Sequence, residues 1–375
     1  MSFFIQGVGA VTPLAPNAAE TWRTLCDGAE APREQVPRRM AGRRYFYCPL
    51  PAKFMADAAQ RPRLRRSSAL SLAGVTAASD AIEDAGLKVG PELGERCAVI
   101  FAICSGGVNY TRRFYHEIAT QGASGASPLL FPETVFNAPA SHVASILNLD
   151  GKSYTLVGDS SVGLSAIHFA TQLLATDPEM AYCLVVGTEE MDWLVSDAFG
   201  SWLMASHCDQ FEVYGRREGT VFGEAAGAVV LGRENGLRIA RSSAGQSFFS
   251  INEAYSAAAE VFSQVVSFEQ PDLVVSSANG TFADEVERQI FQKLGGAVPV
   301  YAYKPALGEA LGAGALLQVV LASLALRSGC LPGTLRSGTK LAAVNRTTRS
   351  IKGCSRALVT VIGFNQQVNA LLIER

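Results

Sequence analysis

Short runs of apolar and β-branched residues alternate with longer segments of helical periodicity along almost the whole chain. Several of the short runs are apolar throughout, which is typical of strands that are covered on both faces. The predicted strands are residues 3–8, 98–102, 154–157, 183–186, 228–231, 273–276, 298–302 and 358–362. The predicted helices are residues 18–27, 67–85, 161–176, 282–294 and 308–328. This alternation of strands and helices predicts an α/β fold built of layers.

A chain of 375 residues with 48% hydrophobic residues can bury one large core or two packed cores. No linker rich in Pro, Gly and Ser divides it, and its most polar interval is residues 232–245. This interval suggests a junction between an N-terminal half, residues 1–235, and a C-terminal half, residues 236–375. Residues 105–135 are glycine-rich and weakly periodic, so they predict an irregular stretch in a lobe, residues 105–150, over the sheet.

The net charge of −2 gives no general attraction to nucleic acid or to an anionic membrane. The apolar helix predicted around residues 311–326 is too short for a membrane span and predicts a buried core helix. One basic segment stands out and predicts either a solvated surface or a docking face for an acidic partner. It contains Arg33, Arg38, Arg39, Arg43, Arg44, Lys53, Arg61, Arg63, Arg65 and Arg66.

The eight cysteines form no CxxC pair. Cys97, Cys104 and Cys183 lie in apolar runs and are predicted to be reduced, buried residues of a cytoplasmic protein. The N-terminal segment lacks the charged region and cleavage site of a signal peptide. No zinc spacing, phosphate-binding loop or dinucleotide fingerprint is present in the sequence, so neither a metal nor a cofactor is expected.

Four segments carry more specific motifs. The chain begins with a strand, Gly7-Val8-Gly9 and a Thr-Pro pair, and residues 217–231 read REGTVFGEAAGAVVL. Residues 304–314 read KPALGEALGAG, and Gly363-Phe364 leads towards Asn369-Ala370. Gly223 and Gly227 would allow close approach of backbones, Gly308 is expected to belong to the structural motif, and Glu224 is expected to be a structural acid that accepts hydrogen bonds.

Together these segments resemble the β-ketoacyl synthase family, whose members have the thiolase fold. The resemblance covers nearly the whole chain and implies two similar αβαβα halves in five layers. It also implies that Lys304 belongs to the structural frame and that Phe364 and position 160 contact substrate. The family's terminal glycine pair is replaced by Asn365 and Gln366.

A synthase of this family uses one Cys at a helix N-terminus and two His residues, and all three are replaced here. Ser160, preceded by Asp159, stands at the Cys position, and a Ser hydroxyl needs an adjacent base to attack. Asn279 stands at the first His position, and an amide cannot take up a proton at neutral pH. Glu309 stands at the second, where a carboxylate would repel an enolate or pair with Lys304 or with a partner's Arg.

The pattern resembles a chain-length factor, a catalytically silent subunit that pairs with an active ketosynthase and shapes the pocket for the growing chain. The resemblance implies an acyl carrier protein as a further partner, with Arg65 and Arg66 as a candidate contact. It also implies the helix near residues 114–118 and the strand around Tyr154 as candidate interface elements. Aromatic polyketide systems typically carry Gln at the position of Ser160, so an aryl-polyene type of system stays open.

Other functions remain open at the level of sequence. Ser160 could serve an acyltransferase or hydrolase if a base came from elsewhere in the fold, although His168 lies eight residues further along the same predicted helix. A decarboxylating synthase needs the two His residues, which Asn279 and Glu309 replace. A binding or scaffold protein of the same fold is the remaining alternative. The chain is therefore not expected to be catalytic alone.

Overall fold

The computed structural model describes residues 2–37, 44–266, 270–293, 298–364 and 367–375. Arg38, Arg39 and Arg43 of the basic segment lie outside the described residues, as do the glycine-pair replacements Asn365 and Gln366. The end of the helix predicted for residues 282–294 also lies outside them.

The N-terminal half contains a five-stranded mixed sheet with the order β5-β4-β6-β8-β1. The pairs β5–β4 and β4–β6 are parallel, whereas β6–β8 and β8–β1 are antiparallel. The strands are β1 (Phe4–Val11), β4 (Cys97–Ile103), β5 (Ser153–Val157), β6 (Tyr182–Glu189) and β8 (Ala225–Gly232). Most of these strands are buried along their length, as expected for strands covered on both faces.

The C-terminal half repeats this arrangement with the order β12-β11-β15-β16-β9. The pairs β12–β11 and β11–β15 are parallel, and β15–β16 and β16–β9 are antiparallel. The strands are β9 (Leu237–Ser242), β11 (Leu273–Val275), β12 (Val300–Tyr301), β15 (Arg356–Ile362) and β16 (Gln367–Glu374). The halves therefore share strand order and direction, and the two sheets meet where β1 pairs with β9 over Phe4 and Ile5.

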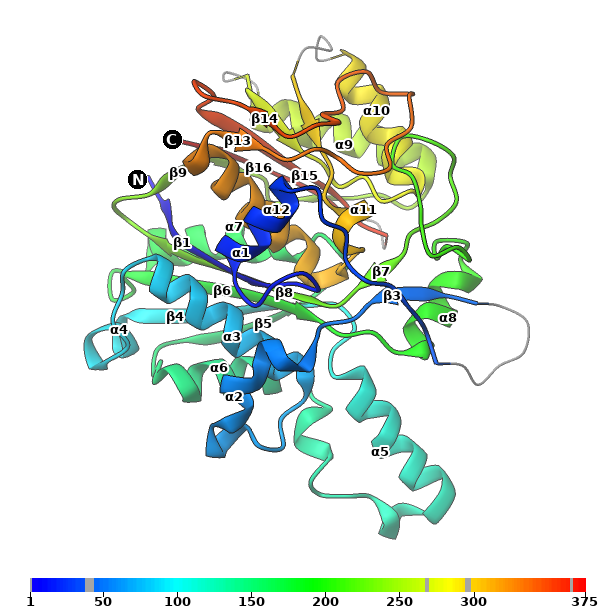
Figure 1. The fold of residues 1–375 in the computed structure, drawn as a ribbon. Coiled ribbons are helices and arrows are strands. Elements are labelled where there is room, and N and C mark those ends of the chain that lie inside the picture. The colour runs from blue at the N-terminus through cyan, green and yellow to red at the C-terminus, as the bar shows by residue number, and fades with distance from the viewer. Residues whose placement is uncertain (1, 38–43, 267–269, 294–297, 365–366) are drawn as a thin grey trace.

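The helices complete five layers (Figure 1). Helices α7 (Val162–Thr176) and α12 (Leu311–Ser328) lie between the sheets and pack against strands of both halves. Helices α3 (Ala69–Asp84) and α6 (Ala138–Leu147) cover the outer face of the N-terminal sheet, and α9 (Ile251–Val266), with α10 (Phe282–Lys293) beside it, covers that of the C-terminal sheet. The predicted α/β fold with two similar halves in five layers is confirmed.

The remaining elements are shorter or peripheral. The helices are α1 (Ala18–Cys26), α2 (Ala56–Gln60), α4 (Pro91–Arg96), α5 (Val108–Gln121), α8 (Trp193–Ser201) and α11 (Lys304–Leu307). The strands are β2 (Glu34–Gln35), β3 (Phe46–Cys48), β7 (Phe222–Gly223), β10 (Gln246–Ser247), β13 (Cys330–Leu331) and β14 (Arg349–Ser350). β2, β3 and β7 form a small separate sheet.

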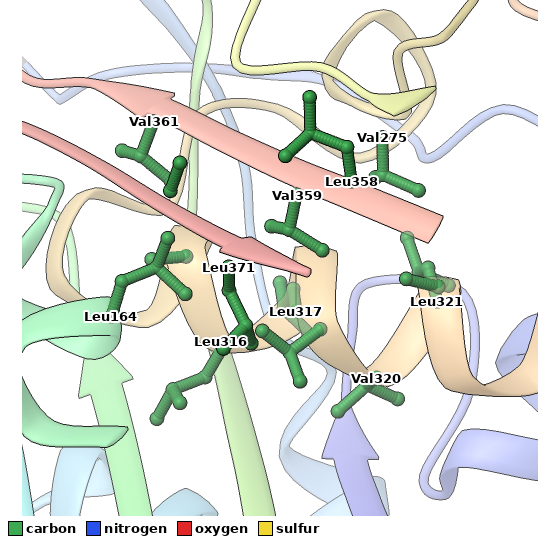
Figure 2. Close-up of a cluster of buried hydrophobic side chains, with 14 of the residues drawn as sticks. Leu164, Val275, Leu316, Leu317, Val320, Leu321, Leu358, Val359, Val361 and Leu371 are labelled. Carbon is green, nitrogen blue, oxygen red and sulfur yellow. The ribbon is translucent and has the colours of Figure 1, made fainter. Parts of the chain in front are cut away.

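Helix α12 is apolar on every side because both sheets cover it. Figure 2 shows Leu316, Leu317, Val320 and Leu321 of this helix beneath Val359 and its neighbours on the C-terminal sheet. It is also the one helix among the described residues that is long and apolar enough to cross a membrane, but 83% of its length is buried inside the protein. The expectation of a buried core helix at this position is confirmed.

Three expectations were wrong in detail. Residues 108–121 of the predicted irregular stretch form the regular helix α5, which includes the helix near residues 114–118 that the resemblance implied. The helix predicted from residue 308 begins at Leu311, because Gly308 has φ +86° and ends α11 instead. Cys97 and Cys183 are buried as predicted, but Cys104 is only partly buried.

The approach of β1 to α3 depends on glycines. A Cβ on Gly9 would lie 2.1 Å from the carbonyl oxygen of Ala77, and one on Gly7 would lie 2.2 Å from that of Ala81. The two residues are spaced by two along the strand, so they present the same face to the helix backbone.

We expect Gly9→Ala to lower the free energy of unfolding by roughly 3 kcal/mol, because the obstructing atoms are backbone and cannot rotate away. Urea denaturation measures the loss. Gly90→Ala is the matched control, because Gly90 has nothing within 4 Å of a built Cβ and an extended φ of 174°. Equal stabilities for the two variants would contradict this account of the packing.

Candidate functional site

The three replaced positions follow the carboxyl ends of strands. Ser160 lies in the turn from β5 to α7, Asn279 in the turn from β11 to α10, and Glu309 between α11 and α12, after β12. All three side chains are buried. The structure joins Asn279 and Glu309 by a hydrogen bond, whereas Ser160 bonds to neither of them within the described residues.

Glu309 lies in a fully connected polar network. Its Oε2 forms an ion pair with Nζ of Lys304 at 2.7 Å and accepts a hydrogen bond from Nδ2 of Asn279 at 3.0 Å. Its Oε1 accepts from the backbone N–H of Leu311 at 3.0 Å. Lys304 also donates to the carbonyl oxygen of Ser277 at 2.8 Å. Of the two cations considered for Glu309, the chain's own Lys304 is the one that the structure pairs with it.

Both the nitrogen and the oxygen of the Asn279 amide also form hydrogen bonds. While Nδ2 donates to Glu309, Oδ1 accepts from Oγ1 of Thr281 at 2.6 Å and from its N–H at 3.3 Å. A catalytic His at this position would exchange a proton or stabilise a developing negative charge. Here the amide cannot exchange the proton, and its donor already points at a carboxylate.

Two acids hold the loop that carries Asn279. Asp284 accepts from the backbone N–H groups of Asn279 at 2.7 Å, Gly280 at 3.0 Å and Tyr214 at 2.7 Å. Burial raises the pKa of Asp284 to about 7. Glu287 accepts from the N–H and Oγ of Ser277, among other donors. The loop that carries Asn279 is therefore held in place by hydrogen bonds to Asp284 and Glu287, in addition to the network of Lys304, Glu309 and Asn279.

Ser160 has no base beside it. Its Oγ is buried and makes no hydrogen bond within the described residues. The preceding carboxylate, Asp159, accepts from the backbone N–H of Ser161 at 2.8 Å and of Gln367 at 3.3 Å. A Ser nucleophile requires a hydrogen-bonded base, and this geometry offers none in the described part of the chain.

The four histidines are placed elsewhere. Nδ1 of His168 contacts Oγ of Ser242 at 3.0 Å, and Nε2 of His142 contacts Oε1 of Glu133 at 2.6 Å. His207 packs against the ring of Tyr45, and His116 lies exposed on α5. Among the described residues, none of them reaches Ser160.

An aromatic cluster adjoins the network. The ring of Phe364 lies 5.2 Å from that of Phe199 and 6.3 Å from that of Phe222. Leu311, with φ +39°, belongs to the same apolar cluster, and Phe364 and Cys104 pack against it. Contact of Phe364 and Ser160 with a substrate stays a prediction.

The two motif segments 217–231 and 304–314 pack against each other. The backbone N–H of Gly223 donates to the carbonyl of Glu309 at 2.9 Å, and the N–H of Glu309 donates to that of Val221 at 2.9 Å. A Cβ on Gly223 would lie 2.4 Å from the carbonyl oxygen of Leu307, and one on Gly308 would lie 2.8 Å from that of Phe222. These glycines let the backbone around Glu309 lie directly on the other segment.

Carboxylates at strand ends also fix the surroundings. Glu224 accepts from the backbone N–H of Leu50 at 2.9 Å and of Met191 at 3.1 Å, and burial raises its pKa. The sequence analysis missed Glu189, which accepts from the N–H groups of Cys104, Ser105 and Gly312. Burial raises the pKa of Glu189 to about 7. The sequence does contain an indication of this site, because the pair Glu189-Glu190 follows an apolar strand.

The basic segment is only partly a free surface. Arg65 and Arg66 are exposed, and Arg63 donates to Oγ of Ser145 at 2.9 Å. Arg33 pairs with Glu30 and donates to the carbonyl of Pro305 at 2.6 Å, so it joins the N-terminal half to the C-terminal half. Contact of Arg65 and Arg66 with a partner stays a prediction.

We expect Lys304→Met to lower the free energy of unfolding by about 3–5 kcal/mol, because it leaves the buried Glu309 carboxylate without its cation. Urea denaturation measures the change. The double variant Lys304→Met/Glu309→Gln removes both charges and should recover most of that loss. A single variant within about 1 kcal/mol of the parent protein would show that the pair is not energetically coupled.

Comparisons with known proteins agree with this geometry. Residues 3–236 match the family model described as "Beta-ketoacyl synthase, N-terminal domain". The 3-oxoacyl-[acyl-carrier-protein] synthase 2 of Rhizobium meliloti (strain 1021) is 27% identical over 99% of this chain and 98% of its own length. The protein of the same name from Coxiella burnetii (strain RSA 493 / Nine Mile phase I) is 23% identical over the same shares.

Solved structures of the same fold cover the whole chain. A beta-ketoacyl synthase from Burkholderia phymatum STM815 has a TM-score of 0.87 at 19% identity, over 100% of this chain and 99% of its own. The ishigamide ketosynthase/chain length factor has a TM-score of 0.87 at 17% identity, over 100% and 98%. The ketosynthase ApeO in complex with its chain length factor ApeC, from Xenorhabdus doucetiae, gives 0.83 at 17% over 100% and 98%. At these identities the structural likeness establishes the fold alone. The family model matches most of the chain, and this match shows that the chain belongs to the β-ketoacyl synthase family.

Proposed function

We propose that this chain is a chain-length factor: a non-catalytic subunit that pairs with an active ketosynthase and shapes the pocket for an acyl chain delivered by an acyl carrier protein. The observation that carries the proposal is the network of Lys304, Glu309 and Asn279. It places at both predicted His positions groups that are already hydrogen-bonded to each other, with Lys304 paired to the carboxylate.

The family reaction needs a thiolate, a proton-exchanging group and donors for a developing negative charge. In place of the thiolate, this chain has the buried hydroxyl of Ser160 without a base. In place of the proton-exchanging group, it has the amide of Asn279, which cannot take up a proton. A carboxylate brings negative charge to the place where donors are needed. The fold around these groups is intact, and Lys304, Glu309 and Asn279 are hydrogen-bonded to one another although the Oγ of Ser160 is unpartnered, which favours selection for a folded, silent subunit over decay.

The outer edge of β5 supports pairing with a second chain. Lys152 O and Gly158 N bond to β4, so the backbone groups of Ser153, Thr155 and Val157 point to the other edge. In the described part of the chain that edge has no neighbour. The opposite end of the sheet differs, because Val300 of β12 bonds to Ala343 and Asn345. β5 also lacks the charges and prolines that usually protect an exposed edge.

The lobe beside β5 adds an apolar surface. Tyr115 on α5 is 63% exposed and Phe131 is 55% exposed, and the ring of Phe114 contacts both. Exposed aromatic groups gathered in this way are typical of protein interfaces. We assign α5 and β5 to the face that meets the ketosynthase, with the lobe as part of the pocket wall.

Similar proteins give the proposal its partners. Two of the structural relatives are ketosynthases with chain length factors, and a third is a type II polyketide acyl-carrier protein in complex with its ketosynthase bound to a hexaketide. By analogy the partner here is a ketosynthase with Cys and two His residues, in a cytoplasmic polyketide or aryl-polyene system. Arg65 and Arg66 are the proposed contact for the carrier protein. The halves divide at residues 235 and 236, and the lobe spans residues 105–150.

Co-expression with a family member that carries the Cys and both His residues should give a heterodimer by native mass spectrometry. Val157→Lys should abolish it, because a lysine at the free edge opposes strand pairing. Val157 is 54% exposed. Val89→Lys is the matched control on an equally apolar, 45% exposed site away from β5, and it should assemble normally. A stable monomer that leaves product length unchanged in the co-expressed system would contradict the proposal.

Ser160→Ala separates this proposal from a Ser160-dependent acyltransferase or hydrolase. The variant removes only an unpartnered hydroxyl. We expect the complex to form the same products at an unchanged rate, as measured by product chromatography. Loss of product with the heterodimer intact would instead assign chemistry to Ser160.

A further inference from the structure

A cavity of about 520 Å³ lies at the surface of the C-terminal half, among α9, α10 and the segment that precedes the 217–231 motif. Its volume is in the range of small-molecule sites. Ser160, Asn279, Glu309 and Phe364 do not line it, but Asp284 and Thr281, which hydrogen-bond to Asn279 or its loop, do. The lining residues that matter here are Arg216, Arg217, Arg288, Lys340, Tyr255 and Phe282.

The charges around the cavity are unbalanced. Four cationic side chains line it, and they face two carboxylates, Asp284 and Glu285. Asp284 is committed to three backbone N–H groups. Glu285 is bound by Arg288 through two contacts of 2.8 and 2.5 Å, and its hydrogen bond to Arg288 lowers its pKa to about 2.

The other three cations are not neutralised in this way. No salt bridge joins Arg216, Arg217 or Lys340 to an acid within the described residues, although the charge of Lys340 also helps to lower the pKa of Glu285, and all three side chains are exposed. The chain as a whole carries a net charge of −2, so this concentration of positive charge is local. Cations that converge on a concave surface bind anions, and arginine forks match phosphate oxygens.

One wall of the cavity is apolar and aromatic. The guanidinium carbon of Arg217 lies 6.0 Å from the centre of the Phe282 ring, which also packs against Phe248. Tyr255 lies at the cavity and receives a hydrogen bond from Nζ of Lys293 at 2.6 Å. Ile251 at the rim is 46% exposed. A ring or chain attached to the anion would find contact here that an inorganic ion could not use.

We propose that this cavity is a binding site for an organic phosphate, with the phosphate groups at Arg216, Arg217 and Lys340 and the organic part against Tyr255 and Ile251. A carboxylate would offer fewer oxygens to three separate cations than a diphosphate does. The site is independent of the proposed chain-length function, because it uses neither the replaced catalytic positions nor the free edge of β5.

Isothermal titration calorimetry of the full chain with ADP, and separately with adenosine and pyrophosphate, tests the proposal. ADP should bind, adenosine should not, and pyrophosphate should bind more weakly than ADP. Arg216→Gln and Lys340→Gln should each weaken ADP binding about tenfold, the usual effect of losing one hydrogen bond to a charged group. Lys88→Gln, an exposed lysine distant in the fold, is the matched control and should leave binding unchanged.

Salt provides a second measurement that needs no variant. ADP affinity should fall as ionic strength rises, because surface charges are screened. Failure of ADP to bind, equal binding of adenosine, or ADP affinity unchanged in both variants would each overturn the proposal. None of these outcomes bears on assembly with a ketosynthase, so the two proposals are tested separately.

Discussion

The buried pair of Lys304 and Glu309 is the interaction on which the centre of the molecule depends. It ties α11 to the start of α12, and through Asn279 it ties both to the β11–α10 turn. Backbone hydrogen bonds from Glu309 continue to Gly223 and Val221 in the other motif segment. A buried charge is costly unless it is paired and hydrogen-bonded, and here every requirement is met within the chain. The groups that satisfy it are therefore no longer free for chemistry.

The repeat of the fold explains why the frame could survive this change. Both halves have the same strand order and direction, and α7 and α12 occupy equivalent places between the sheets. The stability of the central layer comes from apolar contacts such as those of Leu316 and Val320 with the C-terminal sheet (Figure 2). Residues at the helix N-termini can therefore change their chemistry while the layers remain packed.

The sequence predicted much of this, because apolar strands and glycine motifs leave strong local signals. The eight predicted strands and the five helices all have counterparts in the structure, whereas the assignment of Ser160, Asn279 and Glu309 to the catalytic positions stays a prediction. The extent of helix α5 beyond residues 114–118 was not predicted, and neither was the role of Glu189, because its three backbone donors come from distant segments. The packing of segment 217–231 on segment 304–314 could not be read from either motif alone. Pairing of this kind is a property of the tertiary fold.

The central claim is that the chain serves as a non-catalytic subunit that pairs with a ketosynthase and is not itself acylated. Intact-mass spectrometry measures this directly when the chain and an active ketosynthase of the family are incubated together with an acyl-loaded carrier protein. The account predicts an acyl adduct on the partner's catalytic cysteine and none on this chain. An acyl ester on Ser160 that is absent from Ser160→Ala would contradict it.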